Sequence, residues 1–272
     1  MHDTISLLRE LNAHDFTSGA QIAQRLGISR ASVSTGLAKA EEYGVELVRR
    51  HGVGYRLSEP IEWLDRNTIT QYLNADSCII SSVANTLAST NRTLLQEHEH
   101  GKLLVSEWQE QGRGRLGRSW LGALGGSLLF SLAWRFAGGP TQLAGLPLAV
   151  GIAVAKTLQQ AGVAQLGLKW PNDLLLKHNA QWMKVGGILI EMQGDALGPA
   201  NVVVGIGLNL ALPASCHAQL NQAAASLRDA GLQCGRNELL ARLLNQLEST
   251  LNHFAESGFA PLCAEWEALH AW

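Results

Sequence analysis

Three arginines and three glycines alternate within the nine residues GRGRLGRSW, at positions 112–120. Arginine presents a rigid fork of N–H donors that matches the oxygens of a phosphate or a carboxylate. Glycine lets the backbone reach positive φ and approach a ligand closely. The combination predicts a loop that binds an anion, with a phosphate or phosphate ester as the first candidate. On these residues alone, a basic surface turn and a nucleic-acid patch remain alternatives.

Three further motifs place polar side chains beside a proline or beside glycines. In LKWPNDLLL, a proline fixes a turn between two strands, and Lys169, Asn172 and Asp173 flank it. Burial of such groups at a strand end costs free energy unless they contact a partner or a ligand. A hairpin turn that simply carries polar residues is the alternative. Lys184 precedes a Gly-Gly pair and the strand ILIE, so a cation lies beside accessible backbone. GIGLN, at 205–209, is a weaker signal because glycines in strands also mark bulges.

Two polar clusters and one aromatic residue are weaker candidates. Ser89-Thr90-Asn91 could hold a polar head group, but an ordinary helix N-cap explains the same residues. His98-Glu99-His100 has metal-binding side chains, yet it lies in a polar loop without further ligands nearby, so we do not assign a metal to it. Trp120 adjoins the arginine loop and could stack on a flat ring.

The elements that must position these motifs follow residue 60. Strand-like and helical stretches alternate irregularly, and the strands come mostly in adjacent pairs. This order favours an α+β domain with a mixed sheet over a strictly alternating parallel one. We predict strands at 103–108, 127–134, 166–170, 173–176, 184–193 and 201–210, a buried helix at 143–162 and an amphipathic helix at 238–254.

Residues 1–60 have the pattern of a winged helix-turn-helix. Ser18 and Gln21 form a capping box that starts one helix, Gly27 can end it, and Ser29 is the N-cap of the next. ELVRRHGVGYRLSEP then alternates like a hairpin wing. The second helix of such a pair can enter the major groove of DNA. The residues that we expect to contact DNA are Ser29, Ser32, Ser34, Thr35, Lys39, Arg49 and Arg50.

The charge of this N-terminal unit is nearly balanced. Residues 1–58 contain seven Lys and Arg against six Asp and Glu. Weak non-specific binding, and dependence on a dimer or a second half-site, are therefore expected. A small helical unit that docks on protein is the alternative.

The overall composition bounds the class of protein. The 272 residues are 46% hydrophobic and 16% charged, with a net charge of −2, so a globular chain of one large or two moderate domains is expected. Cys78, Cys216, Cys234 and Cys263 lie far apart and suggest neither a disulfide framework nor a zinc site. The N-terminus does not resemble a signal peptide, and the longest apolar run, 143–154, is short for a membrane span. We expect a cytoplasmic protein without a membrane partner.

The motifs STN, GRGRLGRSW, KWPND, KVGGILIE and GIGLN, in that order and behind a winged helix, resemble the family of bifunctional biotin operon repressors and biotin–protein ligases. The resemblance covers nearly the whole chain. It implies a DNA-binding domain at 1–60 and a class II synthetase-like catalytic domain at 61–272.

The resemblance also implies the chemistry and the partners. The family activates biotin with MgATP to biotinyl-5′-AMP and transfers biotin to a lysine of the carrier domain of acetyl-CoA carboxylase. Its members bind operator DNA as homodimers when the ligand is bound. Attack of one anion on another needs positive charge and positioning, which the arginine loop and Lys184 can supply.

Roles carry over from the family by position. The biotin-binding residues that it implies are Ser89, Thr90, Gln109, Gly112, Arg113, Arg115, Lys184, Gly187, Gly205 and Leu208. Arg118, Trp120, Asn172 and Asn209 correspond to nucleotide-binding residues, and Arg115, Arg118 and Lys184 to the catalytic cations. Asp173 is a candidate helper for Mg²⁺ or for the incoming lysine.

The sequence departs from the family pattern in three places. Leu116 stands where the family loop has an arginine, and NQAAASL, at 221–227, lacks the aromatic residue expected near the adenine. The chain stops at WEALHAW, where family members continue as a small β-barrel, so we expect that barrel to be absent. A biotin-sensing regulator that has lost transfer activity is therefore the alternative function. A lipoate-type ligase is a third, which the arginine loop disfavours.

Overall fold

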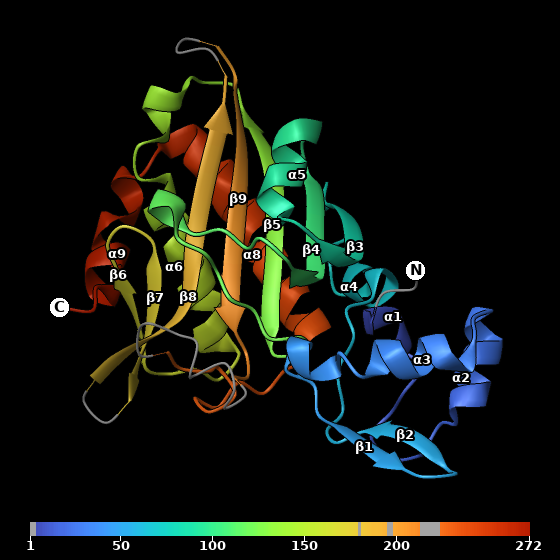
Figure 1. Ribbon diagram of the computed structural model, residues 1–272. Coiled ribbons are helices and arrows are strands. Elements are labelled where there is room, and N and C mark those ends of the chain that lie inside the picture. Colours follow the sequence, from blue (N-terminus) through green and yellow to red (C-terminus); the bar gives the residue numbers. More distant parts are fainter. Residues whose placement is uncertain (1–3, 179–180, 195–197, 213–223) are drawn as a thin grey trace.

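The computed structural model describes residues 4–178, 181–194, 198–212 and 224–272 (Figure 1). Its N-terminal unit has the predicted winged helix-turn-helix form. The two helices of the motif are joined by a tight turn, and the wing is a two-stranded antiparallel hairpin. The elements are α1 (Thr4–Leu8), α2 (Gly19–Leu26), α3 (Arg30–Leu37), a 3-10 turn (Ala40–Tyr43), β1 (Leu47–Arg50) and β2 (Gly54–Leu57).

The predicted caps are confirmed at both helices of the motif. Ser18 accepts from the Gln21 backbone N–H while the Gln21 side chain accepts from the Ser18 backbone N–H, which completes the capping box. Gly27 ends α2 with a left-handed φ of 65°. Ser29 accepts from the Ser32 N–H and starts α3. The helix boundaries in this unit therefore follow from side chains that satisfy otherwise unpaired backbone groups.

The second unit is built on one seven-stranded mixed sheet, in the order β3-β4-β5-β9-β8-β7-β6. Only the β3–β4 pair is parallel among the described strands. The mixed α+β architecture is therefore confirmed. The strands are β3 (Ile80–Leu87), β4 (Lys102–Gln109), β5 (Ser127–Phe136), β6 (Leu166–Lys169), β7 (Asp173–His178), β8 (Gln181–Gln193) and β9 (Ala200–Asn209).

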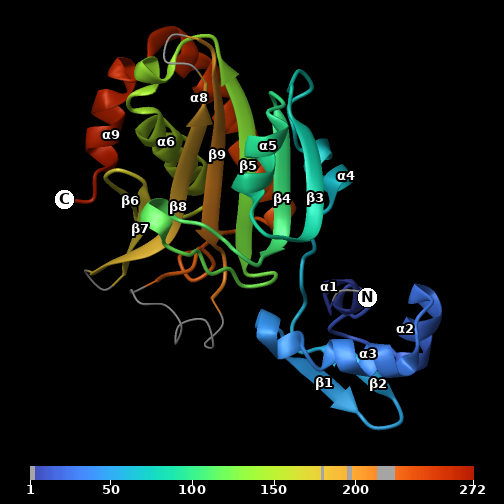
Figure 2. The same ribbon diagram turned by 45° about the horizontal axis from the view of Figure 1, so that its top comes forward.

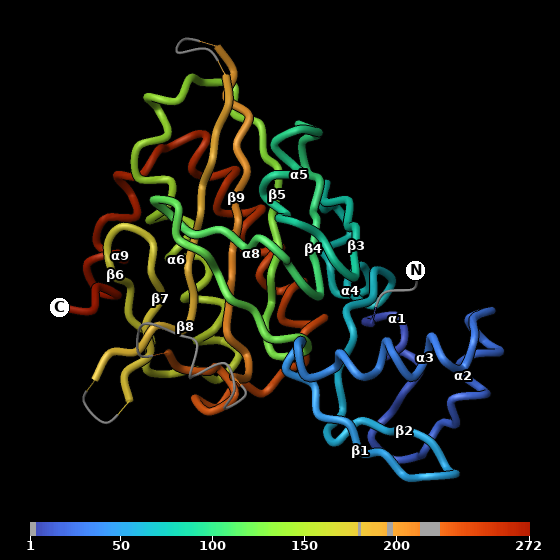
Figure 3. The backbone as a smooth tube through the Cα atoms, viewed as in Figure 1, coloured from blue at the N-terminus to red at the C-terminus, as the bar shows by residue number. Residues whose placement is uncertain are grey.

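Helices cover the two faces of this sheet unequally. Helices α6 (Leu146–Gln160) and α8 (Arg236–Ser257) pack over one face and bury the main hydrophobic core, while α5 (Thr90–Glu97) lies on the other (Figures 1 and 2). Helix α4 (Arg66–Gln71) packs on α8, and α9 (Cys263–Leu269) lies beside α6 and β6. The face that carries α5 is left partly open, and the loop after β4 crosses it (Figure 3).

Two sequence-based expectations need correction. Strand β3 was not predicted, because its residues are half-exposed and polar, as expected of an edge strand. The helix predicted at 143–162 begins at Leu146, since Gly145 has φ 87° and separates it from a 3-10 turn at Pro140–Leu143.

The stretch Pro140–Gln160 is long and apolar enough to cross a membrane by length and composition. This stretch is longer than the uninterrupted apolar run at 143–154 on which the expectation rested. In the structure, however, α6 packs against both the sheet and the neighbouring helix α8, and ten of its residues are buried. This is the position of a core helix. The core helix of a globular protein can be as long and as apolar as a membrane-spanning helix.

A buried polar network joins the two units. The Glu107 carboxylate on β4 receives Arg9 from the N-terminal unit at 3.1 Å and Arg236 from the start of α8 at 2.9 Å. Arg9 also donates to Asn85 on β3 and lies over the Trp63 ring. Glu107 and Arg236 are fully buried, so each depends on the other for charge compensation.

The chain passes from one unit to the other near residues 61–64. Ile61 and Trp63 pack against the N-terminal core, and Leu64 belongs to the core of the sheet domain. Glu62 caps α8, because its carboxylate accepts the backbone N–H groups of Arg236 and Asn237 at 2.7 and 3.1 Å. The connection is therefore bonded to the sheet domain.

Candidate functional site

The arginine loop folds as a short hairpin between β4 and β5. Gly114 N–H donates to the Arg118 carbonyl and Trp120 N–H to the Gly112 carbonyl. Two of the three glycines serve the loop itself. A Cβ on Gly112 would lie 2.5 Å from the Trp120 carbonyl oxygen, and Gly117 has φ 72°. Gly114 has no such requirement, so its backbone is the one that a ligand can approach.

The three arginines of this loop are exposed, and Leu116 at its tip is 90% exposed with φ 55°. A cation in this setting keeps its solvent until a ligand arrives. The loop therefore presents charge outward instead of using it to hold the fold.

A cavity of about 860 Å³ lies between this loop and the open face of the sheet. Its lining includes five cationic side chains and one carboxylate, Asp173, among the described residues. A cavity of this size and charge suits a ligand of nucleotide dimensions that carries negative charge. The cations are Arg113, Arg115, Arg118, Lys169 and Lys184.

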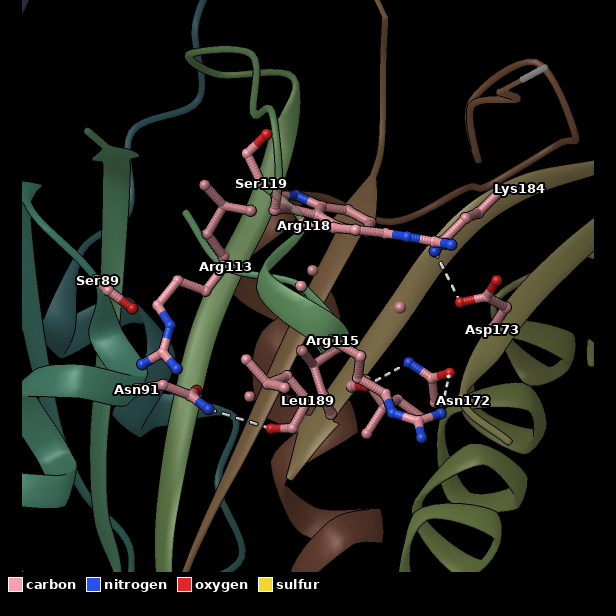
Figure 4. Close-up of a pocket in the computed structure, with 18 of the residues that line it drawn as sticks. Ser89, Asn91, Arg113, Arg115, Arg118, Ser119, Asn172, Asp173, Lys184 and Leu189 are labelled. Carbon is pink, nitrogen blue, oxygen red and sulfur yellow. Dashed lines mark hydrogen bonds and ion pairs between the residues drawn. The ribbon is translucent and has the colours of Figure 1, made fainter. Parts of the chain in front are cut away.

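One end of the cavity carries the polar groups Ser89 and Asn91, with Arg113 beside them (Figure 4). Gln109 Oε1 accepts the Thr90 backbone N–H at 2.8 Å, and Ser131 Oγ lies 2.7 Å from Thr90 Oγ1. Ser89 is the N-cap residue of α5, but its hydroxyl makes no capping hydrogen bond. The plain N-cap explanation therefore does not use this side chain, which lines the cavity.

The other end carries paired charges. Lys184 Nζ lies 2.7 Å from Asp173 Oδ1, across the β7–β8 pair. Arg115 donates to Asn172 Oδ1 at 3.1 Å, and Asn172 Nδ2 donates to the Ile188 carbonyl. Both cations are held by partners that a bound phosphate or carboxylate could replace.

Trp120 lies over the glycines of β8 and β9. A Cβ added to Gly207 would be 2.6 Å from the Trp120 ring, and one on Gly187 would be 3.0 Å from it. Lys184 Nζ is 5.6 Å from the ring centroid. The indole Nε1 is buried without a hydrogen-bond partner in the described part of the chain. These glycines therefore provide a flat floor on which an aromatic ring rests.

Most of the residues implied by the resemblance meet in this cavity. Twelve of them line it: Ser89, Thr90, Gln109, Arg113, Arg115, Arg118, Trp120, Asn172, Asp173, Lys184, Gly187 and Gly205. Three do not. Gly112 is buried beneath Trp120, and Leu208 points to the helical face of the sheet, where it joins the core. Asn209 is buried at the end of β9, and its carbonyl accepts from Leu227.

A charged residue that the motifs did not single out, Glu191, contacts the polar end of the cavity. Glu191 on β8 accepts from Arg113 at 2.7 Å and from Asn91 Nδ2 at 3.0 Å. Asn91 in turn meets Ser131 on β5. Asn91 and Glu191 stand inside the quoted motifs STN and ILIE, but only the fold shows that they face each other.

The residues around the cavity fit a magnesium ion only as part of MgATP. Among the described residues there is no group of three or more His, Cys, Asp or Glu that could hold a metal ion. Asp173 is a lone carboxylate, already paired with Lys184. Mg²⁺ is often bound by one or two carboxylates together with substrate phosphates, so Asp173 could contribute one ligand.

The segment around residue 225 lies beside this charged end. Ala225 N–H donates to the Lys184 carbonyl, and Leu227 N–H to that of Asn209. Residues 224–227 contain no aromatic side chain, in line with the departure noted above, and 221–223 lie outside the described residues. The same holds for Cys216, whereas Cys78, Cys234 and Cys263 are free thiols.

The residues predicted to contact DNA are all exposed. Ser29, Ser32, Ser34, Thr35 and Lys39 are exposed on or beside α3, whose Val33 and Leu37 are buried. Arg49 and Arg50 are exposed on the wing, and Arg49 donates to the Leu37 carbonyl at the end of α3. The wing and the second helix are thus joined directly.

Known proteins match both units. A profile of the Biotin/lipoate A/B protein ligase family matches residues 78–209, and an HTH domain profile matches 4–56. The bifunctional ligase/repressor BirA of Escherichia coli is 35% identical over 97% of this chain and 81% of its own length. The biotin--[acetyl-CoA-carboxylase] ligase of Mycobacterium tuberculosis is 34% identical over 72% of this chain and 73% of its own length.

A solved structure supports the same relation for the fold. The biotin protein ligase of Aquifex aeolicus, in complex with biotin and ATP, is 28% identical over 71% of this chain and 78% of that one, with a TM-score of 0.57. The order of the motifs, the winged helix and the cation-lined cavity agree with these similarities. The chain therefore belongs to the family of the bifunctional ligase/repressor BirA.

Proposed function

We propose that this chain activates biotin with ATP to biotinyl-5′-AMP and transfers the biotin to a lysine of the carrier domain of acetyl-CoA carboxylase. It also acts as a repressor of biotin synthesis genes that binds operator DNA when it holds biotinyl-AMP. We place this activity in the cytoplasm. The observation that carries the proposal is the cavity lined by uncharged polar side chains, among them Ser89, Thr90 and Gln109, together with five cations and a single carboxylate among the described residues.

In the first step, a biotin carboxylate oxygen attacks the α-phosphorus of ATP and the bond to pyrophosphate breaks. Two anions must approach each other, so the rate depends on cations that neutralise both. Arg115 and Arg118 on the loop and Lys184 on β8 line that part of the cavity. Lys184 would exchange Asp173 for the ligand, and Arg115 would exchange Asn172.

In the second step, the lysine amine of the carrier attacks the acyl carbon, and AMP leaves. This step needs an open path to the acyl group and a base or water to accept the amine proton. Asp173, released from Lys184, is the carboxylate of the cavity that could accept it. No covalent intermediate on the protein is required, because the adenylate is already the activated species.

A magnesium ion bound with ATP would neutralise charge on the phosphates, and Asp173 is the side chain that would help to hold it. Trp120, on its floor of glycines, and Asn172 are assigned to the nucleotide. Asn209 would reach it only through a local change at the end of β9.

The repressor activity is assigned to the winged helix, with Ser29, Ser32, Ser34, Thr35, Lys39, Arg49 and Arg50 facing the DNA. A near-neutral unit binds a single site weakly, so a homodimer on two half-sites is expected. Ligand that orders the exposed arginine loop would favour this dimer. Sedimentation with and without biotin and ATP tests the coupling, and equal dimer affinity in both states would contradict it.

One experiment separates the enzymatic alternatives. The protein is incubated with biotin, MgATP and a biotin carboxyl carrier domain, while pyrophosphate release and biotin on the carrier are both followed. We expect both signals. Adenylate that forms and is retained without transfer would instead support a biotin-sensing regulator. Absence of both signals would overturn the ligase proposal.

A matched control makes the carrier signal specific. A carrier domain with its acceptor lysine changed to arginine should leave pyrophosphate release intact in the first turnover and abolish labelling. Labelling that persists on this variant would show diffusion of free adenylate instead of directed transfer.

A further inference from the structure

We infer that the winged helix and the sheet domain move on DNA as a single unit, and that this limits the spacing between the two half-sites that a dimer can bind. The inference rests on a clamp, in which the winged-helix unit contacts both faces of the sheet at the end of β4. It deepens the proposed repressor activity and depends on it. It adds a property of the DNA, the half-site spacing, for which the protein selects.

One side of the clamp is polar. Glu107 lies on the face of the sheet covered by α8, where it meets Arg236, and it accepts from Arg9 at 3.1 Å. Arg9 directly follows α1, and its Nε donates to Asn85 Oδ1 on β3 at 2.9 Å. Glu107 Oε1 also accepts the backbone N–H of Leu64, in the connection between the units, at 2.7 Å. The end of α1 is therefore bonded to two strands of the sheet.

The other side of the clamp is apolar. Trp108 follows Glu107 on β4, and successive side chains of a strand point to opposite faces of the sheet. The Trp108 ring meets the ring of Tyr43, in the 3-10 turn after α3, edge to face with 5.0 Å between centroids. Both rings pack on the core of the winged helix, which Leu124 also joins from the chain before β5. The end of β4 is therefore held from both faces.

The clamp is connected directly to the helix that is assigned to DNA. Helix α1 contacts both β3 and α3 and lies between them (Figures 1 and 2). It approaches α3 closely because Gly36 has no side chain, and a Cβ there would overlap Leu7 of α1. Thr4 Oγ1 also donates to the Gly36 carbonyl at 3.2 Å. The direction of α3 relative to the sheet is therefore set by the elements that hold β4.

A clamped winged helix makes the half-site spacing a property of the protein. Domains joined by a linker alone move relative to each other by default. In a dimer joined through its sheet domains, two clamped copies of α3 instead have a fixed separation and direction. Each base pair added between the half-sites shifts one of them by about 3.4 Å and turns it by about 35°. The dimer can follow this change only if the DNA or the junction is deformed.

The test measures binding against half-site spacing. Full-length protein with biotin and MgATP selects a site from a library of random DNA duplexes. The selected site is then resynthesised with single base pairs added or removed between its half-sites. For wild type, we expect each change to weaken binding at least about 10-fold. Arg9→Gln combined with Tyr43→Leu opens both sides of the clamp, and the loss should fall below about 3-fold.

Two measurements separate positioning from folding or charge. An isolated half-site should bind wild type and the double variant equally, because α3 and the wing are unchanged. Either single variant should show an intermediate loss, so the trend is measurable even if the double variant fails to fold. Arg25→Gln is the matched control, because it removes the same charge from an exposed pair with Glu10 inside the winged helix and should keep the wild-type loss.

Two results would overturn the inference alone. One is a wild-type protein that tolerates added base pairs, and the other is an equal loss in wild type and in every clamp variant. Selected sites that contain one half-site only would overturn the proposed dimer, and the inference with it.

Discussion

The molecule contains two polar clusters, made of similar side chains, that are used in opposite ways. At the junction of the two units, Glu107 and Arg236 are fully buried and 2.9 Å apart, with Arg9 as a second cation. In the cavity, Arg115 and Lys184 each have one polar partner, and neither side chain is fully buried. The charges of the first cluster stabilise the fold, whereas the charges of the second can bind a ligand.

The difference lies in burial, because the residue types are shared. A buried ion pair contributes little net stability compared with an apolar substitute, but breaking it leaves an uncompensated charge at high cost. A partly exposed pair is worth little and is easily exchanged. Stability should therefore be sensitive to the junction and insensitive to the cavity, and activity should show the reverse.

The largest expected loss of stability follows substitution of Glu107, at the centre of the junction. Glu107→Gln removes the carboxylate paired directly with the buried Arg236 guanidinium and should lower the free energy of unfolding by about 3 kcal/mol. Urea denaturation measures it. Glu265→Gln is the matched control, because its partner Lys156 is exposed and the loss should be under about 1 kcal/mol. Similar losses in both variants would contradict the comparison.

Substitution of a cation in the cavity should lower enzymatic activity and leave stability nearly unchanged. Arg115→Ala removes a cation from the reacting phosphate and should lower pyrophosphate release at least about 100-fold. The free energy of unfolding should change by less than about 0.5 kcal/mol, because the loop is exposed. Leu116→Ala, in the same loop, is the control and should keep adenylate formation. Unaltered pyrophosphate release in Arg115→Ala would refute the assignment.

A smaller effect is expected from the second cation of the junction. Arg9→Gln should cost about 1 kcal/mol, since Arg9 is 30% exposed and Arg236 still neutralises Glu107. In combination with Glu107→Gln the loss should be less than additive, because both changes remove the same contact. Additive losses would show that Arg9 acts through Trp63 and Asn85 alone.

The smallest effect concerns pH. Burial opposes ionisation of Glu62, but the N–H groups of Arg236 and Asn237 outweigh it, so the pKa of Glu62 lies below its ordinary value of 4.5. A lowered pKa contributes stability above 4.5 that is lost as pH falls through the folded-state value. Glu62→Gln should therefore be less stable than wild type at neutral pH, and the difference should shrink in acid. A difference in stability that does not change with pH would mean that the charge of Glu62 contributes nothing and that only the packing of its side chain matters.

Local patterns predicted much of this architecture. The capping box at Ser18, the left-handed Gly27 and the wing glycines are short-range features, and the structure has them where the sequence predicts them. Buried strands such as β5 and β9 are also recognisable in the sequence as apolar runs. Edge strand β3 is not, because serine, asparagine and threonine interrupt its apolar residues and most of its side chains are only half-buried.

Long-range pairings could not be predicted. Glu107 stands in a stretch correctly predicted as a strand, but its partner Arg9 is 98 residues away along the chain. Glu191 meets Asn91 from 100 residues away. A single sequence gives the side chains and their secondary structure, whereas these pairs depend on the order of strands in the sheet and on how the two units pack.

The left-handed backbone at Leu116 has a consequence for the energy of the loop. A leucine at φ 55° costs about 1 to 3 kcal/mol relative to ordinary backbone, and its exposed side chain recovers little of this by packing. The ligand-free loop is therefore held in a shallow free-energy minimum. A ligand that binds the arginines can therefore change the conformation of the loop at a small cost in free energy. That cost subtracts little from the affinity.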